Sequence, residues 1–116
     1  MTIRRLQPEQ RLSGAVIHGK TVYLAGQVAD DPSLDAEGQT ADILRQIDAL
    51  LAEAGTDKSR LLMCQVFVAD IADVAAMNRA WDAWLDTANK PARATVEARL
   101  VDPAWKVEIT GIAAIP

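Results

Sequence analysis

Two residues near the C-terminal end, Arg93 and Glu108, have the side chains best suited to chemistry. A planar guanidinium pairs bidentately with a carboxylate, and a glutamate can accept a proton from water. Each lies in a run of alternating polar and apolar residues, and residues 101–105 between the runs favour a turn. The pattern predicts a β-hairpin over residues 91–115 with Arg93 and Glu108 on one face. From the residues alone, an interfacial ion-pair network is the favoured interpretation of this pair.

The elements that must position this pair are read from the hydrophobic periodicity. Strands are predicted near residues 2–6, 14–18, 21–28 and 61–69, and helices at 37–54 and from the Asp70 N-cap to the stop at Asn89–Pro91. The order is therefore β-β-β-α-β-α-β-β. This order predicts an α+β fold with two helices on one face of a mixed sheet.

The other face of the sheet is predicted to be open. The polar residues of the hairpin are expected on that face among small apolar groups: Arg93, Thr95, Glu97, Arg99 and Glu108. Glu97 and Arg99 are interpreted as structural, cross-strand partners of the second arm. A symmetric oligomer that packs the open faces together would bury them and leave polar groups in interfacial clefts.

The composition is typical of one globular domain, residues 1–116. Of the residues, 50% are hydrophobic and 24% are charged. The net charge of -4 argues against nucleic acid as the main partner, because phosphate binding relies on clustered Lys and Arg. The single cysteine, Cys64, excludes an intrachain disulfide and a cysteine-based zinc site, and we interpret it as a buried apolar residue. No signal peptide or membrane-spanning run is found, so we expect a cytoplasmic protein.

Residues 14–21 match the phosphate-binding loop G-x-x-x-x-G-K-[ST]. That loop needs a helix after it, whereas both flanks here favour strands around a Gly19–Lys20 turn, so we predict a hairpin instead. His18 beside this turn has no second potential ligand nearby in the sequence. Trp81 and Trp84 lie on the apolar stripe of the second helix and are interpreted as core or intersubunit contacts.

Two segments together resemble the C-terminal signature of the RidA/YjgF family, also called L-PSP-like proteins. They are P-A-R-A-T-V at 91–96 and K-V-E-I at 106–109. Residues 23–28, Y-L-A-G-Q-V, are similar to the family's strand that ends in Gly-Gln. The A-W-D-A-W stretch at 80–84 and V-D-P-A-W-K-V-E-I at 101–109 most resemble the YoaB-like branch. The resemblance covers essentially the whole chain.

The resemblance implies a chorismate-mutase-like α+β fold and a homotrimer with clefts between its subunits. It also implies a cofactor-free hydrolase, an enamine/imine deaminase that converts reactive 2-imino and 2-enamino acids into 2-keto acids and ammonia. Arg93 matches the family arginine that binds the substrate carboxylate, and Glu108 matches the glutamate that positions water. The implied partner is a small molecule with a carboxylate, and no metal or organic cofactor is implied.

Two positions depart from the archetypal members, because Thr95 replaces a cysteine and Leu12 replaces a tyrosine. Both are candidate substrate-binding residues, as is Trp105 in the loop before the second arm. Two other functions stay open. One is a non-catalytic trimeric module that binds 2-keto acids in the Arg93 cleft, and the other is the endoribonuclease or translation inhibitor for which some members are named. Glu108 favours catalysis, because a second carboxylate in the cleft hinders simple carboxylate binding. The excess of acidic residues argues against RNA as the substrate.

Overall fold

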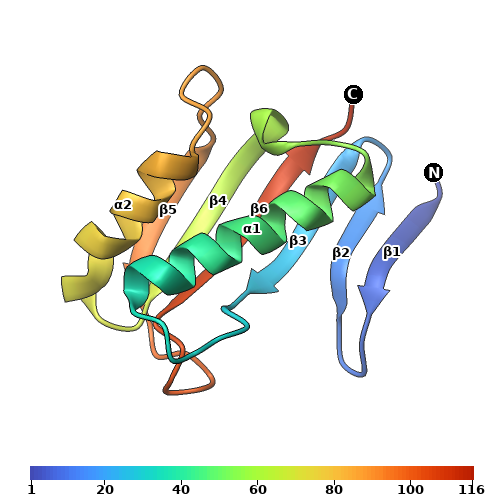
Figure 1. Ribbon diagram of the computed structural model, residues 1–116. Helices are drawn as coiled ribbons and strands as arrows, with labels where there is room; N and C mark the ends of the chain where they lie inside the picture. Colours follow the sequence, from blue (N-terminus) through green and yellow to red (C-terminus); the bar gives the residue numbers. More distant parts are fainter.

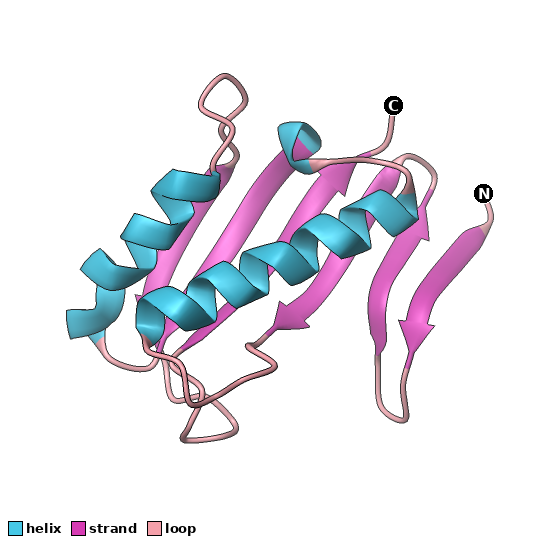
Figure 2. Cartoon of the chain, in the orientation of Figure 1, coloured by secondary structure: helices cyan, strands magenta, loops and turns pink.

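The computed structural model describes residues 1–116 as one mixed sheet with two helices on one of its faces (Figures 1 and 2). The strands are β1 (Ile3–Pro8), β2 (Ser13–His18), β3 (Thr21–Gln27), β4 (Leu61–Val68), β5 (Ala92–Glu97) and β6 (Val107–Ala114). The helices are α1 (Ala36–Ala54) and α2 (Val74–Trp84), with short 3₁₀ turns η1 (Lys58–Arg60) and η2 (Ile71–Asp73). The predicted element order and the α+β class are confirmed.

The predicted hairpin between the last two strands is wrong. The strand order is β1-β2-β3-β6-β4-β5, so β4 separates β5 from β6. β5 pairs in parallel with β4 at one edge of the sheet, and β6 pairs antiparallel with both β3 and β4. Glu97 and Arg99 therefore have no cross-strand partner on β6. Instead, the Glu97 carboxylate accepts a hydrogen bond from the Ile71 backbone N–H.

The path of residues 98–106 explains this arrangement. The Ala98 N–H donates to the Val68 carbonyl, and the Ala69 N–H donates to the Lys106 carbonyl, both at 2.9 Å. The chain thus passes around the end of β4 before it starts β6. β4 gains a partner on each edge, as expected for a strand whose backbone groups must be satisfied in the centre of a sheet.

The helix boundaries follow their capping residues. Asp35 accepts a hydrogen bond from the Gly38 N–H at the start of α1, and Gly55 ends the helix in the left-handed conformation at φ 89°. The second helix is shorter than predicted at both ends. Asp70 caps the turn η2 rather than α2, and α2 itself ends at Trp84. Neither helix combines the length and apolarity that a membrane crossing demands.

Residues 14–21 form most of the β2–β3 hairpin and not a phosphate-binding loop. His18 pairs directly with Thr21, and Gly19 at the turn has a φ of 62°, which glycine adopts without strain. No helix follows Thr21, because β3 continues to Gln27. The prediction of a hairpin at this place is confirmed.

The helix-covered face of the sheet contains the core. Alternate residues of the inner strands contribute to it, and they pack against Ile43, Leu44, Ile47, Leu51, Met77 and Trp81 from the helices. On β4 these inward residues include Cys64, Val66 and Val68, and on β6 they include Val107 and Ile109. Because successive side chains point to opposite faces, the residues between them must lie on the open face.

An apolar row crosses that open face. The strand pairing places Val16, Tyr23, Ile112, Met63 and Ala92 side by side on β2, β3, β6, β4 and β5. Tyr23 is 47% exposed, Met63 40% and the nearby Val96 42%. The predicted open face is therefore present. It is more apolar than expected because Arg93, Thr95 and Glu97 point to the helix-covered side instead.

Candidate functional site

Arg93 lies on the edge strand β5 and points to the helix-covered side of the sheet. Its partner in the sheet is Cys64, a core residue, and its guanidinium carbon lies 5.0 Å from the centre of the Trp81 ring on α2. One guanidinium nitrogen also approaches the Met77 sulfur at 3.9 Å. The ion pairs of the chain join Arg45 to Asp42 and Arg79 to Glu37, so the Arg93 guanidinium has no carboxylate partner.

Thr95 follows on the same side of β5, opposite the core residue Val66. Its hydroxyl oxygen is buried and has no hydrogen-bond partner. Such groups are rare in folded proteins, because a buried hydroxyl without a partner costs about 1–3 kcal/mol. Arg93 and Thr95 therefore present unused donor groups on the same side of one strand.

Glu108 lies on β6, on the opposite face. It pairs with Phe67, whose neighbours Val66 and Val68 point into the core, so Phe67 and Glu108 point to the open side. The carboxylate lies against Gly26, where a Cβ atom would be 2.2 Å from one carboxylate oxygen. Only glycine at position 26 leaves room for this placement. The Glu108 side chain also borders a hollow of about 260 Å³ with Phe67 and residues 98–101.

Arg93 and Glu108 do not share a face, contrary to the sequence-based expectation. Arg93 is opposite Cys64 and Glu108 is opposite Phe67, so two strand spacings and three residues separate their Cα atoms, about 14 Å in all. The cause is β4, which lies between the two strands and changes the register that a hairpin would have. Thr95 and Glu97 also point to the helix side with Arg93. Within one chain, Arg93 and Glu108 cannot contact one small ligand together.

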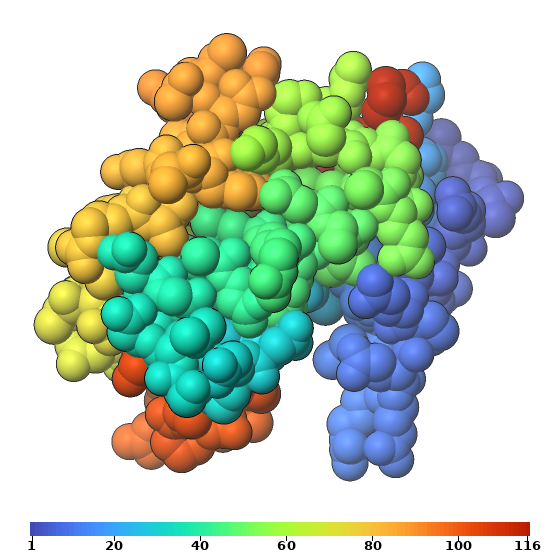
Figure 3. Space-filling model, viewed as in Figure 1, coloured from blue at the N-terminus to red at the C-terminus, as the bar shows by residue number.

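The other two predicted site residues are far from Arg93 as well. Leu12 is an exposed residue in the loop between β1 and β2, at the sheet edge opposite β5. This hairpin projects away from the rest of the molecule (Figure 3). Trp105 is half-buried in the loop before β6 and lines a hollow of about 680 Å³ with residues 97–103 and Ala69. Residues 98–101 of that loop line both this hollow and the Glu108 hollow, so the loop that carries Trp105 borders Glu108, whereas Leu12 lies near neither candidate catalytic group.

Gln39 on α1 is a positioning residue that the sequence reasoning missed. Its side chain is 0% exposed and donates to the carbonyls of Pro32, Leu34 and Ala104. The side-chain carbonyl oxygen of Gln39 accepts a hydrogen bond from the Lys106 backbone N–H at 2.8 Å. One amide thus joins the loop before α1 to the loop that carries Trp105 and leads into Glu108. A glutamine at a core position of the helical pattern was the available signal, since buried amides need partners.

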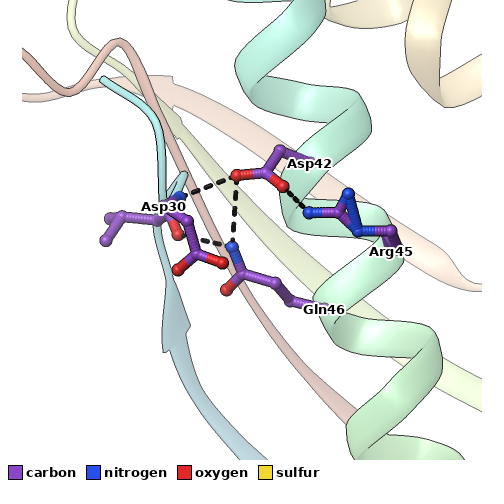
Figure 4. Close-up of polar contacts among 5 residues, drawn as sticks. Asp30, Asp42, Arg45 and Gln46 are labelled. Carbon is purple, nitrogen blue, oxygen red and sulfur yellow. Dashed lines mark hydrogen bonds and ion pairs between the residues drawn. The ribbon is translucent and has the colours of Figure 1, made fainter. Parts of the chain in front are cut away.

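A second polar cluster fixes the chain that leaves Gly26. Asp42 on α1 is only 8% exposed, and its carboxylate accepts the Asp30 N–H at 2.7 Å and pairs with Arg45 (Figure 4). Gln46 reaches the same carboxylate and donates to the Val28 carbonyl. These contacts hold residues 28–30 against α1. The Asp42 carboxylate already has its partners within the chain, so we assign this cluster a structural role.

Cys64 is buried beside Arg93, as its position in a central strand predicts. Burial raises the pKa of its thiol to about 11, although the positive charge of Arg93 acts in the opposite direction. A thiol with this pKa stays protonated near neutral pH and is a poor nucleophile. His18 is exposed and pairs with Thr21, and no three His, Cys, Asp or Glu side chains gather in a cluster.

The fold and the site together define a class: small α+β chains with an unpaired guanidinium at one sheet edge and a carboxylate on an open apolar sheet face. Residues 2–115 match the family model described as Endoribonuclease L-PSP. The chain belongs to this family, which is also called RidA/YjgF, and to its YoaB-like branch.

Relatives support this assignment over nearly the whole length. A RutC family protein of Haemophilus influenzae is 50% identical over 114 residues, which covers 97% of this chain and 98% of the relative. The RutC family protein YoaB of Escherichia coli K12 is 48% identical over 115 residues, 99% of this chain and 100% of the relative. The crystal structure of a YjgF family member from Neisseria meningitidis has 43% identity and a TM-score of 0.97, covering 100% of this chain and 97% of that one.

Proposed function

We propose that the protein is an enamine/imine deaminase that hydrolyses 2-imino acids, and the 2-enamino acids in equilibrium with them, to 2-keto acids and ammonia. The observation that carries the proposal is the Arg93 guanidinium, which is exposed, held over an aromatic ring and free of any carboxylate from its own chain. A guanidinium in this condition is suited to bind an external carboxylate in a bidentate pair.

Glu108 supplies the second group that the reaction needs. Its carboxylate accepts a proton from a water molecule while the water oxygen attacks the C=N carbon of the iminium. The resulting carbinolamine is protonated on nitrogen, forms the C=O bond and releases ammonia. Iminium and water thus give a 2-keto acid and an ammonium ion, with no change in oxidation state. Thr95, two residues from Arg93, offers its unpaired hydroxyl to the same bound carboxylate.

The two groups come together only if two copies of the chain contribute to one site. We propose a homotrimer in which the open sheet faces pack on one another and the Arg93 edge of one subunit approaches Glu108 of the next. Two features support this arrangement. The apolar row Val16, Tyr23, Ile112, Met63 and Ala92 is suited to burial, and Arg93 and Glu108 lie about 14 Å apart on opposite faces of one chain.

Subunit mixing tests the activity and the shared site together. The imine is generated by an amino-acid oxidase and trapped competitively with semicarbazide, and keto-acid formation is followed. Arg93→Ala and Glu108→Gln are each expected to be inactive. When the two variants are unfolded together and refolded, every mixed trimer regains one complete site, so about a quarter of the wild-type rate returns for random mixing. A double variant that carries both changes, mixed with either single variant, is the control and restores nothing.

Each outcome has a distinct meaning. If wild type does not accelerate hydrolysis for any of several amino acids, the deaminase proposal fails. Binding of 2-keto acids that depends on Arg93 would then favour a non-catalytic binding module. If wild type is active and verified mixed oligomers show no recovery, the two residues do not share a site across subunits. If Glu108→Gln keeps its rate, Glu108 does not activate water.

A further inference from the structure

The contact between Arg93 and Trp81 joins a flexible side chain to a rigid one. Trp81 is 5% exposed and belongs to the core cluster, and its ring packs against that of Trp84 with centroids 5.7 Å apart. Arg93 lies on an exposed edge strand, and its guanidinium carbon is 5.0 Å from the Trp81 ring centre. α2 lies next to β5 (Figure 1), and two residues of this helix, Trp81 and Met77, contact Arg93.

The N–H donors of the Arg93 guanidinium are free to bind a carboxylate. A cation–π contact places the cation over the face of the aromatic ring and does not occupy the guanidinium N–H donors with an oxygen acceptor. The Arg93 hydrogen-bond donors meet only the weak acceptor Met77 Sδ at 3.9 Å. By contrast, the guanidinium of Arg79 is engaged by the Glu37 carboxylate and that of Arg45 by Asp42. The Arg93 guanidinium is therefore held beside an aromatic ring, and its N–H donors meet no carboxylate of the chain.

We propose that Trp81 is a positioning residue whose ring orients Arg93 for carboxylate binding. A free arginine side chain loses considerable rotamer freedom when it is fixed by a ligand, and a side chain already held in place loses less. The inference rests on the proposed function, because it takes Arg93 as the group that binds the substrate carboxylate. Trp81 acts on binding alone. Within its own chain Trp81 contacts Arg93 and not Glu108, so we expect it to change the binding of the carboxylate and not the activation of water.

The decisive experiment changes the electron density of the ring and keeps its shape. Tryptophans with one to four fluorine atoms are introduced at position 81 alone, in the full oligomer. Dissociation of pyruvate, a simple 2-keto acid, is measured by calorimetry, and stability is measured by urea unfolding. We expect the affinity to fall with each added fluorine, by about two- to fivefold over the series, and the unfolding free energy to stay constant. In the deaminase assay KM rises by the same factor and kcat is unchanged.

Trp84 provides a matched control. It lies one turn further along α2, its indole N–H donates to Asp48, and its ring faces the Lys58 ammonium at 5.0 Å. The same fluorinated series at position 84 weakens a cation–π contact that does not involve Arg93, so pyruvate affinity is expected to stay constant. Arg93→Ala is measured alongside and is expected to abolish pyruvate binding.

The results separate this inference from the proposed function. If Arg93→Ala binds pyruvate as wild type does, the proposed carboxylate site is wrong. If Arg93→Ala loses binding but affinity is flat or rises across the Trp81 series, Trp81 only fills space and the positioning role is wrong. Equal responses at positions 81 and 84 also overturn it, because the effect would then be one of helix packing.

Discussion

Both faces of the sheet carry isoleucine and valine side chains, but the two helices cover only one of them. The contrast is clearest on β6, where Ile109 is 0% exposed beneath α1 and Ile112 lies half-buried in the row that crosses the open face. Glu108 points to the open face, and Arg93 points to the helix-covered face. One face thus supplies the stability of the chain and the other supplies the surface for assembly, and each holds one of the proposed functional groups.

A charge on the open face is expected to have the largest effect. Ile112→Lys places an ammonium in the middle of the apolar row, where packing against a second copy would bury it at high cost. We expect the oligomer to dissociate and the deaminase activity to disappear, because Arg93 and Glu108 no longer meet. Sedimentation velocity measures the first effect and the coupled oxidase assay the second.

The control for this variant is Ile71→Lys. Ile71 is 59% exposed in the η2 turn, and its backbone N–H donates to Glu97, which points to the helix side of the sheet. It is expected to leave mass and activity unchanged. An Ile112→Lys protein that keeps the mass of the wild-type oligomer would show that the open face is not the interface.

A truncation beneath the helices is expected to act on stability instead. Ile109→Ala removes a side chain that is 0% exposed and leaves a cavity, which costs about 2–5 kcal/mol in the free energy of unfolding. Urea unfolding should show this loss equally at low and high protein concentration. Ile112→Ala should show a loss that is present at high protein concentration and shrinks as the protein is diluted into the range where wild type dissociates, since its contacts are intermolecular. The same concentration dependence for both variants would remove the distinction between the faces.

Gly26→Ala tests the placement of Glu108 on the open face. The new Cβ atom would lie 2.2 Å from a Glu108 carboxylate oxygen, and the flexible glutamate is the part that moves. Stability should therefore change little, whereas kcat/KM falls about 10- to 100-fold, as expected for a displaced catalytic group. In a Glu108→Ala background the same glycine change should have no further effect. An additional loss in that background would mean that Gly26 acts independently of Glu108.

The smallest effect is expected at Cys64, on the covered face. Its folded pKa of about 11 exceeds the ordinary value of 9.0, so the unfolded chain releases its thiol proton first as the pH rises. The free energy of unfolding should therefore fall between pH 8 and pH 10, by about 1 kcal/mol. Cys64→Ala, followed by urea unfolding at each pH, should remove this part of the slope. An unchanged slope would show that the thiol titrates normally.

Much of this arrangement was predictable from local patterns. The apolar run of β4 indicated a central strand, and Gly55 indicated the end of α1, because these signals depend only on neighbours along the chain. The pairing of the last two strands was not predictable in this way. Alternation shows which residues share a side within one strand, but it does not identify the neighbouring strand, and residues 98–106 are long enough to pass around β4.

The candidate site was predictable residue by residue but not as a geometry. Arg93 and Glu108 were identified from the residue types and the resemblance, yet their separation onto opposite faces depends on the strand inserted between them. Trp81 and Gln39 were missed as neighbours of the site for a related reason. Their contacts to Arg93 and Lys106 join residues that are distant in sequence, and hydrophobic periodicity does not indicate such contacts.

The position of β6 also governs how the chain reaches its native state. Residues 107–114 form the strand between β3 and β4, so the sheet consists of two unconnected parts until this segment arrives. Folding must bring a late segment between two early ones, which implies contacts of long sequence separation and a slow closing step. During synthesis these edges of β3 and β4 stay unpaired until β6 emerges, and in that interval the chain is exposed to pairing with other strands.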